Sequence, residues 1–151
     1  MTPDAAPHGA GGAQATRIGP LLRFAHRRAS REFTEALRPL AIEGRHYGVL
    51  LSLGLHGSLS QRELIDRTGS DKSGMVRTVD DLEARGLAVR RPSPADRRAY
   101  AVELTETGRA LHAEAGRIAD SVAARLLDCL SEDEQSTFCA LLERFVTADT
   151  T

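Results

Sequence analysis

Apolar residues recur at helical spacing on both sides of Gly69. Before it, Leu64 and Ile65 give an apolar side to a helix that would start at Ser60. After it, apolar residues repeat at intervals of three and four within residues 72–85, at Met75, Val76, Val79 and Leu82. The pattern predicts two helices joined by a short turn at residues 69–71.

Polar residues mark the ends of these two helices. Ser60 and Glu63 have the spacing of a capping box, in which each side chain satisfies a free backbone N–H group of the first turn. Gly69 suits the left-handed conformation that often ends a helix. Either Ser70 or Asp71 can cap the second helix.

Two stretches that alternate apolar and polar residues follow, at 88–91 and 100–104, as in half-buried strands. Gly86 separates the second helix from the first strand, and the loop 92–98 contains two prolines and two adjacent arginines. The order of helix, turn, helix, strand, basic loop and strand predicts a winged helix-turn-helix. Because such units place their second helix in the major groove, the pattern indicates DNA binding.

The chain before this unit contains two more predicted helices. Residues 1–16 are rich in Ala, Gly and Pro, and we expect a disordered tail there. A helix begins at Thr16 or Arg17 and ends before Pro39. The range 44–55 is apolar on most sides, which predicts a buried second helix.

The chain after this unit continues with two amphipathic helices. Thr105 caps one that runs to about Leu130, and a second capping box, Ser131 with Glu134, opens the last. The first, fifth and sixth helices each carry an apolar stripe that the small winged unit cannot cover, which predicts a homodimer. The predicted fold is mainly α (α+β), a single domain over 17–151, with a winged helix-turn-helix lobe at 57–104 and dimerisation helices at 17–56 and 105–147.

Charge adds to this prediction through its distribution. The chain has 20 basic and 21 acidic residues. Residues 85–98 contain five arginines and a single acidic residue, Asp96, whereas residues 105–151 contain four basic and nine acidic residues. A local basic patch beside acidic segments is typical of a protein that contacts phosphate with one surface.

Other features bear on location and redox state. No stretch approaches the roughly 20 apolar residues of a membrane span, and the sequence shows no signal peptide. We therefore expect a cytoplasmic protein in which Cys129 and Cys139 are buried and reduced.

Three motifs together resemble the MarR (multiple antibiotic resistance regulator) family. They are Val79-Asp80-Asp81-Leu82-Glu83-x-x-Gly86-Leu87, Arg90-Arg91-x-x-x-x-Asp96-Arg97-Arg98 and Leu104-Thr105-x-x-Gly108. The resemblance implies a homodimeric transcriptional regulator, by family default a repressor, that binds a palindromic operator in double-stranded DNA. It also implies release by a small aromatic or phenolic ligand, pairing of Asp96 with a neighbouring arginine, and insertion of Arg98 at the tip of the wing.

Residues expected to contact DNA lie on both helices and on the wing. Those for base readout are Ser73, Gly74, Met75 and Arg77, although Met75 is nearly as well explained as a core residue. Those for the phosphate backbone are Ser60, Gln61, Arg62, Lys72, Arg90 and Arg91. Those of the wing are Asp96, Arg97 and Arg98, with both arginines suited to a minor groove.

Residues expected to contact the effector lie on the first two helices. They are Arg23, His26, Arg27, His46 and Tyr47, a set suited to a phenol or carboxylate. His46 and Tyr47 are explained at least as well as structural helix residues.

Other functions find less support in the sequence. His46 and His112 could bind zinc, but the sequence contains no His-x-x-x-His or Cys-x-x-Cys pair. A redox switch at Cys129 and Cys139 is a weaker alternative than packing. We find no catalytic motif and expect neither an enzyme nor a bound cofactor. A winged-helix module that binds protein partners is the remaining alternative, and the basic wing argues against it.

Overall fold

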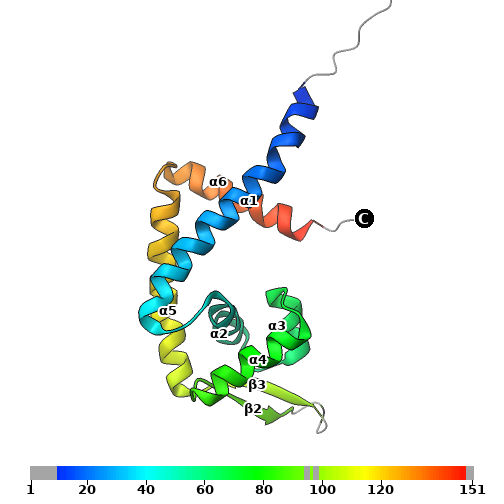
Figure 1. The fold of residues 1–151 in the computed structure, drawn as a ribbon, viewed down its shortest axis with the longest axis vertical. Helices are drawn as coiled ribbons and strands as arrows, with labels where there is room; N and C mark the ends of the chain where they lie inside the picture. Colours follow the sequence, from blue (N-terminus) through cyan, green and yellow to red (C-terminus); the bar gives the residue numbers. More distant parts are fainter. Residues whose placement is uncertain (1–9, 94–95, 97–98, 149–151) are drawn as a thin grey trace, which may run out of the picture.

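The computed structural model describes residues 10–93, 96 and 99–148 of the protein. Its elements in chain order are α1 (Ala10–Leu37), the 3-10 helix η1 (Arg38–Leu40), α2 (Gly44–His56), β1 (Leu59–Ser60), α3 (Gln61–Thr68), α4 (Lys72–Ala84), β2 (Ala88–Pro92), β3 (Tyr100–Leu104), α5 (Glu106–Leu127) and α6 (Glu132–Thr147). Figure 1 shows α2 to β3 gathered into one unit, called the head below, from which α1, α5 and α6 extend. The predicted mainly α fold with a winged helix-turn-helix is confirmed.

The caps of the helix-turn-helix follow the local rules. The Ser60 hydroxyl accepts the Glu63 N–H, and the Glu63 carboxylate accepts the Ser60 N–H at 2.7 Å. Gly69 ends α3 with φ 68° in the left-handed region. Asp71, and not Ser70, caps α4, because its carboxylate accepts the Gly74 N–H at 2.8 Å.

The sheet has three antiparallel strands in the order β1-β3-β2. β2 and β3 form the predicted wing hairpin, with Arg90 opposite Val102. The short strand β1 was not predicted, since two residues are too few to show alternation. It pairs Leu59 with Val102 and so ties the start of α3 to the wing.

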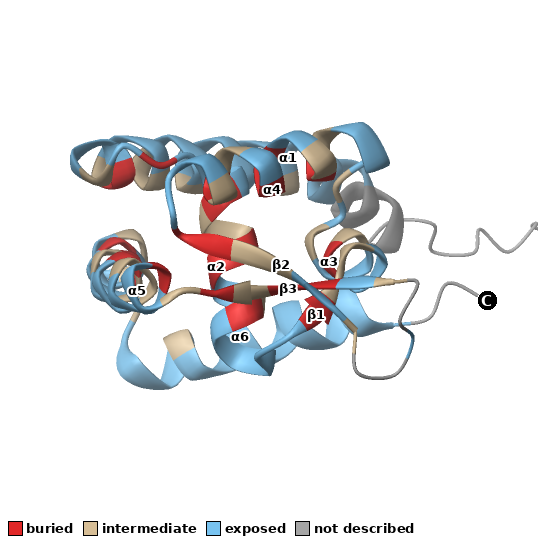
Figure 2. Cartoon of the chain, turned by 90° about the horizontal axis from the view of Figure 1, so that it is seen from below, coloured by how far each residue is buried: buried red, intermediate tan, exposed pale blue. Residues whose placement is uncertain are grey.

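The hydrophobic core lies inside the head (Figure 2). Its largest fully buried side chains include Leu50, Leu53, Leu64 and Leu82. The structure therefore places α2 in the core of the head, although the domain prediction grouped it with the dimerisation helices. Leu37 at the end of α1 is also fully buried, which anchors that helix to the head.

Two sequence-based expectations differ from the structure. α1 begins at Ala10 instead of Thr16 or Arg17, because its Ala-rich first turns favour a helix despite Gly11 and Gly12. Residues 1–9 of the expected tail lie outside the described residues. Cys129 and Cys139, expected to be buried, are both exposed and free in this chain.

The outer helices leave apolar surface uncovered. α6 has no buried residue, and Leu141 and Phe145 on it are 52% and 61% exposed. On α1, Ile18, Leu21 and Phe24 are all more than half exposed. None of the described helices combines the length and apolar character that a membrane span requires.

Candidate nucleic-acid interface

The recognition helix α4 has one buried and one exposed face. Val79 and Leu82 are fully buried against the core, and Met75 is only 1% exposed. Since Met75 cannot reach DNA from that position, its assignment to base readout is wrong and it is a core residue. Lys72, Ser73 and Arg77 are exposed.

The start of α4 is stabilised electrostatically. Asp71 caps the helix, and its hydrogen bond with the Gly74 N–H holds the pKa of the Asp71 carboxyl below its ordinary value. The capping Glu63 of α3 likewise has a lowered pKa, because it accepts hydrogen bonds from Ser60. Both helix starts of the helix-turn-helix are therefore held by ionised caps at neutral pH.

Three cations on the helix-turn-helix are available to a ligand. Among the described residues, Arg62, Lys72 and Arg77 make no side-chain hydrogen bond or ion pair with another side chain, and all three are exposed. Gln61 is half-buried at the first turn of α3, beside Arg62. An exposed, unpaired cation near a helix N-terminus is suited to a phosphate or a base edge.

Arg90, by contrast, serves the protein itself. Its guanidinium pairs with Asp80 at 2.8 Å and with Glu83, and its backbone N–H donates to Glu83 at 2.8 Å. These contacts connect β2 to α4. Arg90 was expected to bind phosphate, but its charge is already neutralised by two carboxylates. Arg91 is 63% exposed and lies 3.5 Å from Glu103, which leaves it accessible.

The wing is described only in part. Arg97 and Arg98 lie outside the described residues. Asp96 is exposed, and its carbonyl accepts the Ala99 N–H at 3.0 Å. The Ser93 N–H donates to the Ala99 carbonyl at 2.8 Å, which closes the loop between β2 and β3.

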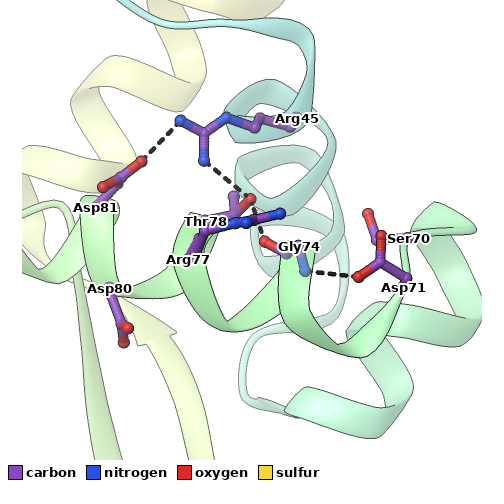
Figure 3. Close-up of a pocket in the computed structure, with 8 residues that line it drawn as sticks. All are labelled: Arg45, Ser70, Asp71, Gly74, Arg77, Thr78, Asp80 and Asp81. Atoms are coloured by element: carbon purple, nitrogen blue, oxygen red, sulfur yellow. Dashed lines mark hydrogen bonds and ion pairs between the residues drawn. The ribbon is translucent and has the colours of Figure 1, made fainter.

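A pocket of about 460 Å³ opens beside α4 (Figure 3). Its lining residues are Arg45, Ser70, Asp71, Gly74, Arg77, Thr78, Asp80 and Asp81. Arg45 of α2 points across it to Asp81 and Thr78 of α4. Arg45 and Thr78 were not singled out from the sequence, because the residues they join lie more than 30 positions apart. The nearest signal was Asp81, which is part of the MarR-like motif.

The residues expected to contact the effector are not all on one side of α2. Arg23, His26 and Arg27 are exposed on α1. Tyr47 also lies against α1, but at Phe33, six residues beyond Arg27; the two ring centroids are 5.7 Å apart. His46 is buried and turned to α4, where its Nε2 lies 3.5 Å from Asp81.

The two histidines considered as an alternative zinc site, His46 and His112, lie near opposite ends of α2. His46 is in its first turn, whereas the His112 ring lies against Gly54 near its last turn. Positions 46 and 54 are separated by about 12 Å along a helix, at 1.5 Å per residue. Zinc requires every ligand atom within roughly 2.3 Å, so His46 and His112 do not bind one ion.

Comparison with known proteins identifies a family and relatives to which the chain is similar. The model of the MarR family matches residues 42–99. The chain is 32% identical over 133 residues to the HTH-type transcriptional repressor NicR of Pseudomonas putida, covering 88% of this chain and 84% of NicR.

Two solved structures share the fold over most of their length. A mutant MarR from E. coli complexed with operator DNA has a TM-score of 0.79 at 25% identity, covering 91% of this chain and 99% of that one. BpsR of Bordetella bronchiseptica, whose DNA binding is regulated by 6-hydroxynicotinic acid, has a TM-score of 0.80 at 29% identity, covering 87% and 94%.

Proposed function

The chain belongs to the MarR family, and we propose that it is a DNA-binding transcriptional repressor that reads a palindromic operator as a homodimer. The observation that supports this proposal is the exposed face of α4, where Lys72 and Arg77 make no side-chain hydrogen bond or ion pair within the described residues. Cations that were structural would be paired, as Arg90 is. A protein of this kind would act in the cytoplasm, beside the DNA that it binds.

The proposal assigns each group of residues a part in DNA binding. Ser73, Gly74 and Arg77 read base edges in the major groove, where the small side chain of Ser73 and the lack of one at Gly74 allow close approach. Backbone phosphates are bound by Ser60, Gln61, Arg62, Lys72 and Arg91. The wing residues Asp96, Arg97 and Arg98 enter the neighbouring minor groove. Met75 and Arg90 have no direct part.

The homodimer is supported by the uncovered apolar surface. Exposed apolar side chains lie along α6 and, at Ile18, Leu21 and Phe24, in the middle of α1. A patch of this kind on a lone chain is unfavourable in water, and a two-fold partner with the same patch covers it. Two heads related by a two-fold axis would then read the two halves of an inverted repeat.

We further propose a small aromatic or phenolic acid as effector. The relative BpsR responds to 6-hydroxynicotinic acid, a compound of this class. In this chain Arg23, His26 and Arg27 of α1 and Tyr47 of α2 would contact it. Burial raises the pKa of Tyr47, so its hydroxyl stays protonated and can donate a hydrogen bond to a carboxylate. His46 is left out because it faces α4.

The test is a mobility-shift titration with the full chain at two salt concentrations. The DNA probes are the intergenic DNA beside its own gene and duplexes that the protein selects from a random pool. We expect a specific shift, and the affinity of the protein for DNA should fall steeply with salt. The reason is that Lys and Arg side chains that bind phosphates displace counterions from DNA. Salicylate and 6-hydroxynicotinic acid, added in turn, test the effector class.

Arg77→Ala provides the variant arm, and Arg38→Ala its matched control. Arg38 is an exposed arginine that pairs with Glu35 at 2.6 Å. Arg77→Ala should weaken specific binding by about 1–3 kcal/mol for each lost base contact, whereas Arg38→Ala should bind like the wild type. A pool that yields no enriched sequence, together with no shift on the intergenic DNA, would contradict the proposal.

A further inference from the structure

Arg45 connects the start of α2 to the recognition helix. Its guanidinium donates to Asp81 at 2.7 Å and to the Thr78 hydroxyl at 3.3 Å, while its Nε donates to Glu43 at 2.9 Å. Thr78 donates its own proton to the Gly74 carbonyl at 2.9 Å, so its oxygen is free to accept from Arg45. Both terminal nitrogens of the Arg45 guanidinium therefore donate to α4.

A second arginine holds the end of the same helix. Arg85, the C-terminal cap residue of α4, donates to the Ala41 carbonyl at 2.9 Å and to the Leu40 carbonyl at 3.3 Å. Thr78, Asp81 and Arg85 are spaced by three and four residues and so share one side of α4. That side faces the connection between α1 and α2.

His46 adds a buried contact at the centre. Its Nδ1 accepts the Glu43 backbone N–H at 3.0 Å, so in the neutral ring the proton sits on Nε2. Nε2 is buried without a full hydrogen bond and lies 3.5 Å from the Asp81 carboxylate. The hydrogen bond from Arg45 is also the main reason that the pKa of Asp81 is lowered. Asp81 is thus ionised, accepts a hydrogen bond from Arg45 and lies beside the Nε2 proton of His46.

We call this set of contacts the junction latch: Arg45, His46 and the carbonyls of Leu40 and Ala41 on one side, and Thr78, Asp81 and Arg85 of α4 on the other. These contacts hold α4 at its middle and at its C-terminal end. They therefore oppose rotation of α4 about its own axis. A rotation of about 10° would move a side chain about 5–6 Å from the axis by roughly 1 Å. That displacement exceeds the roughly 0.5 Å range of a good hydrogen bond.

We propose that Arg45 is a positioning residue for operator reading, which through Asp81 and Thr78 sets the rotation of α4 and thereby the place where Arg77 meets DNA. The inference rests on the proposed function, since it gives a second arginine a part in DNA binding without contact to DNA. The alternative for Arg45 is a direct phosphate contact, because it lines the same pocket as Arg77.

The experiment compares wild type, Arg45→Ala, Asp81→Ala and the double variant on a duplex that the wild type selects from a random pool. Affinity is measured at several salt concentrations, and circular dichroism and sedimentation check the fold and the oligomeric state. Arg38→Ala is again the matched control, because its ion pair with Glu35 lies at the same junction but outside the latch. Arg45→Gln, which retains a donor for Thr78, replaces Arg45→Ala if the latter does not fold.

We expect Arg45→Ala to bind about tenfold more weakly, a change of about 1.4 kcal/mol, with the salt slope of the wild type. The double variant should be no weaker than the single ones, since both remove the same contact. Amide hydrogen exchange without DNA should become faster in α4 of Arg45→Ala than in α3.

Three results would overturn the inference. Wild-type affinity in Arg45→Ala would show that the latch does not matter for reading. A salt slope lowered by about 0.9 for each lost contact would make Arg45 a phosphate ligand. Additive losses in the double variant would separate Arg45 from Asp81. If the wild type itself enriches no duplex, the proposed function has failed and the inference fails with it, which the wild-type lane alone reveals.

Discussion

The close approach between Gly108 and Leu87 makes the sharpest stability prediction. Gly108 lies in the first turn of α5, beside the carbonyl of Leu87 just before β2. A Cβ added at Gly108 would lie 1.8 Å from the Leu87 oxygen and 2.9 Å from its carbonyl carbon. Because the obstacle is backbone, Gly108→Ala must push α5 away from the head.

The expected cost follows from the contacts that would be displaced. Overpacking of this kind costs about 1–3 kcal/mol. The Leu87 carbonyl also accepts the Thr105 N–H at 3.1 Å, and loss of such a hydrogen bond costs about 1 kcal/mol more. The higher helix propensity of alanine offsets about 1 kcal/mol of this loss in stability. We therefore expect Gly108→Ala to lower the free energy of unfolding by about 2 kcal/mol.

Gly116 in the same helix is the matched control, since a Cβ there meets nothing within 4 Å. Gly116→Ala should raise the free energy of unfolding by up to about 1 kcal/mol. The assay is urea unfolding followed by circular dichroism at one fixed protein concentration, because the stability of a dimer depends on concentration. A Gly108→Ala protein as stable as Gly116→Ala would refute the close approach of Leu87 and α5.

Two further predictions concern pH and assembly. Burial is the main cause that lowers the pKa of His46 below its ordinary value of 6.5. As pH falls, the unfolded chain therefore takes up this proton more readily than the folded one. The free energy of unfolding should then decrease as pH drops below about 6.5. His46→Gln should lose this slope in a pH series of urea unfolding, and an unchanged slope would assign it to other groups. The charged groups that face His46 are Glu43, Arg45, Asp81 and Arg85. Phe145→Asp should shift a dimer to monomers in sedimentation equilibrium, because it places a charge on the exposed apolar side of α6. Ser136→Asp, at another exposed position of the same helix, should not. Equal dimerisation of the two variants would exclude the side of α6 that carries Phe145 from the dimer interface.

The starts of α3, α5 and α6 were predictable because capping is local. Ser60, Thr105 and Ser131 each accept an N–H three residues ahead, and the sequence pattern alone predicts that geometry. The strand β1 was not predictable in this way. Leu59 and Ser60 become a strand only because β3 lies beside them, which is a tertiary contact.

The residues of the site also separate into those that local sequence predicts and those that depend on tertiary contacts. Helical periodicity predicted that Lys72, Ser73 and Arg77 would face outward, and they do. Periodicity also placed Met75 in the apolar repeat with Val79 and Leu82, and it is buried with them, so its assignment to base readout went against the pattern. Which arginine is paired could not be predicted, since the Arg45–Asp81 contact joins positions 36 apart in the chain.

This distinction changes how the basic patch is understood. The sequence places five arginines in residues 85–98, yet Arg85 is bound to two backbone carbonyls and Arg90 to two carboxylates. Counterion release depends only on cations that meet phosphate, so these two arginines should add little to the salt dependence of binding. Any effect they have on DNA binding would be indirect, because Arg90 joins β2 of the wing to α4 and Arg85 joins α4 to Leu40 and Ala41 in the connection between α1 and α2.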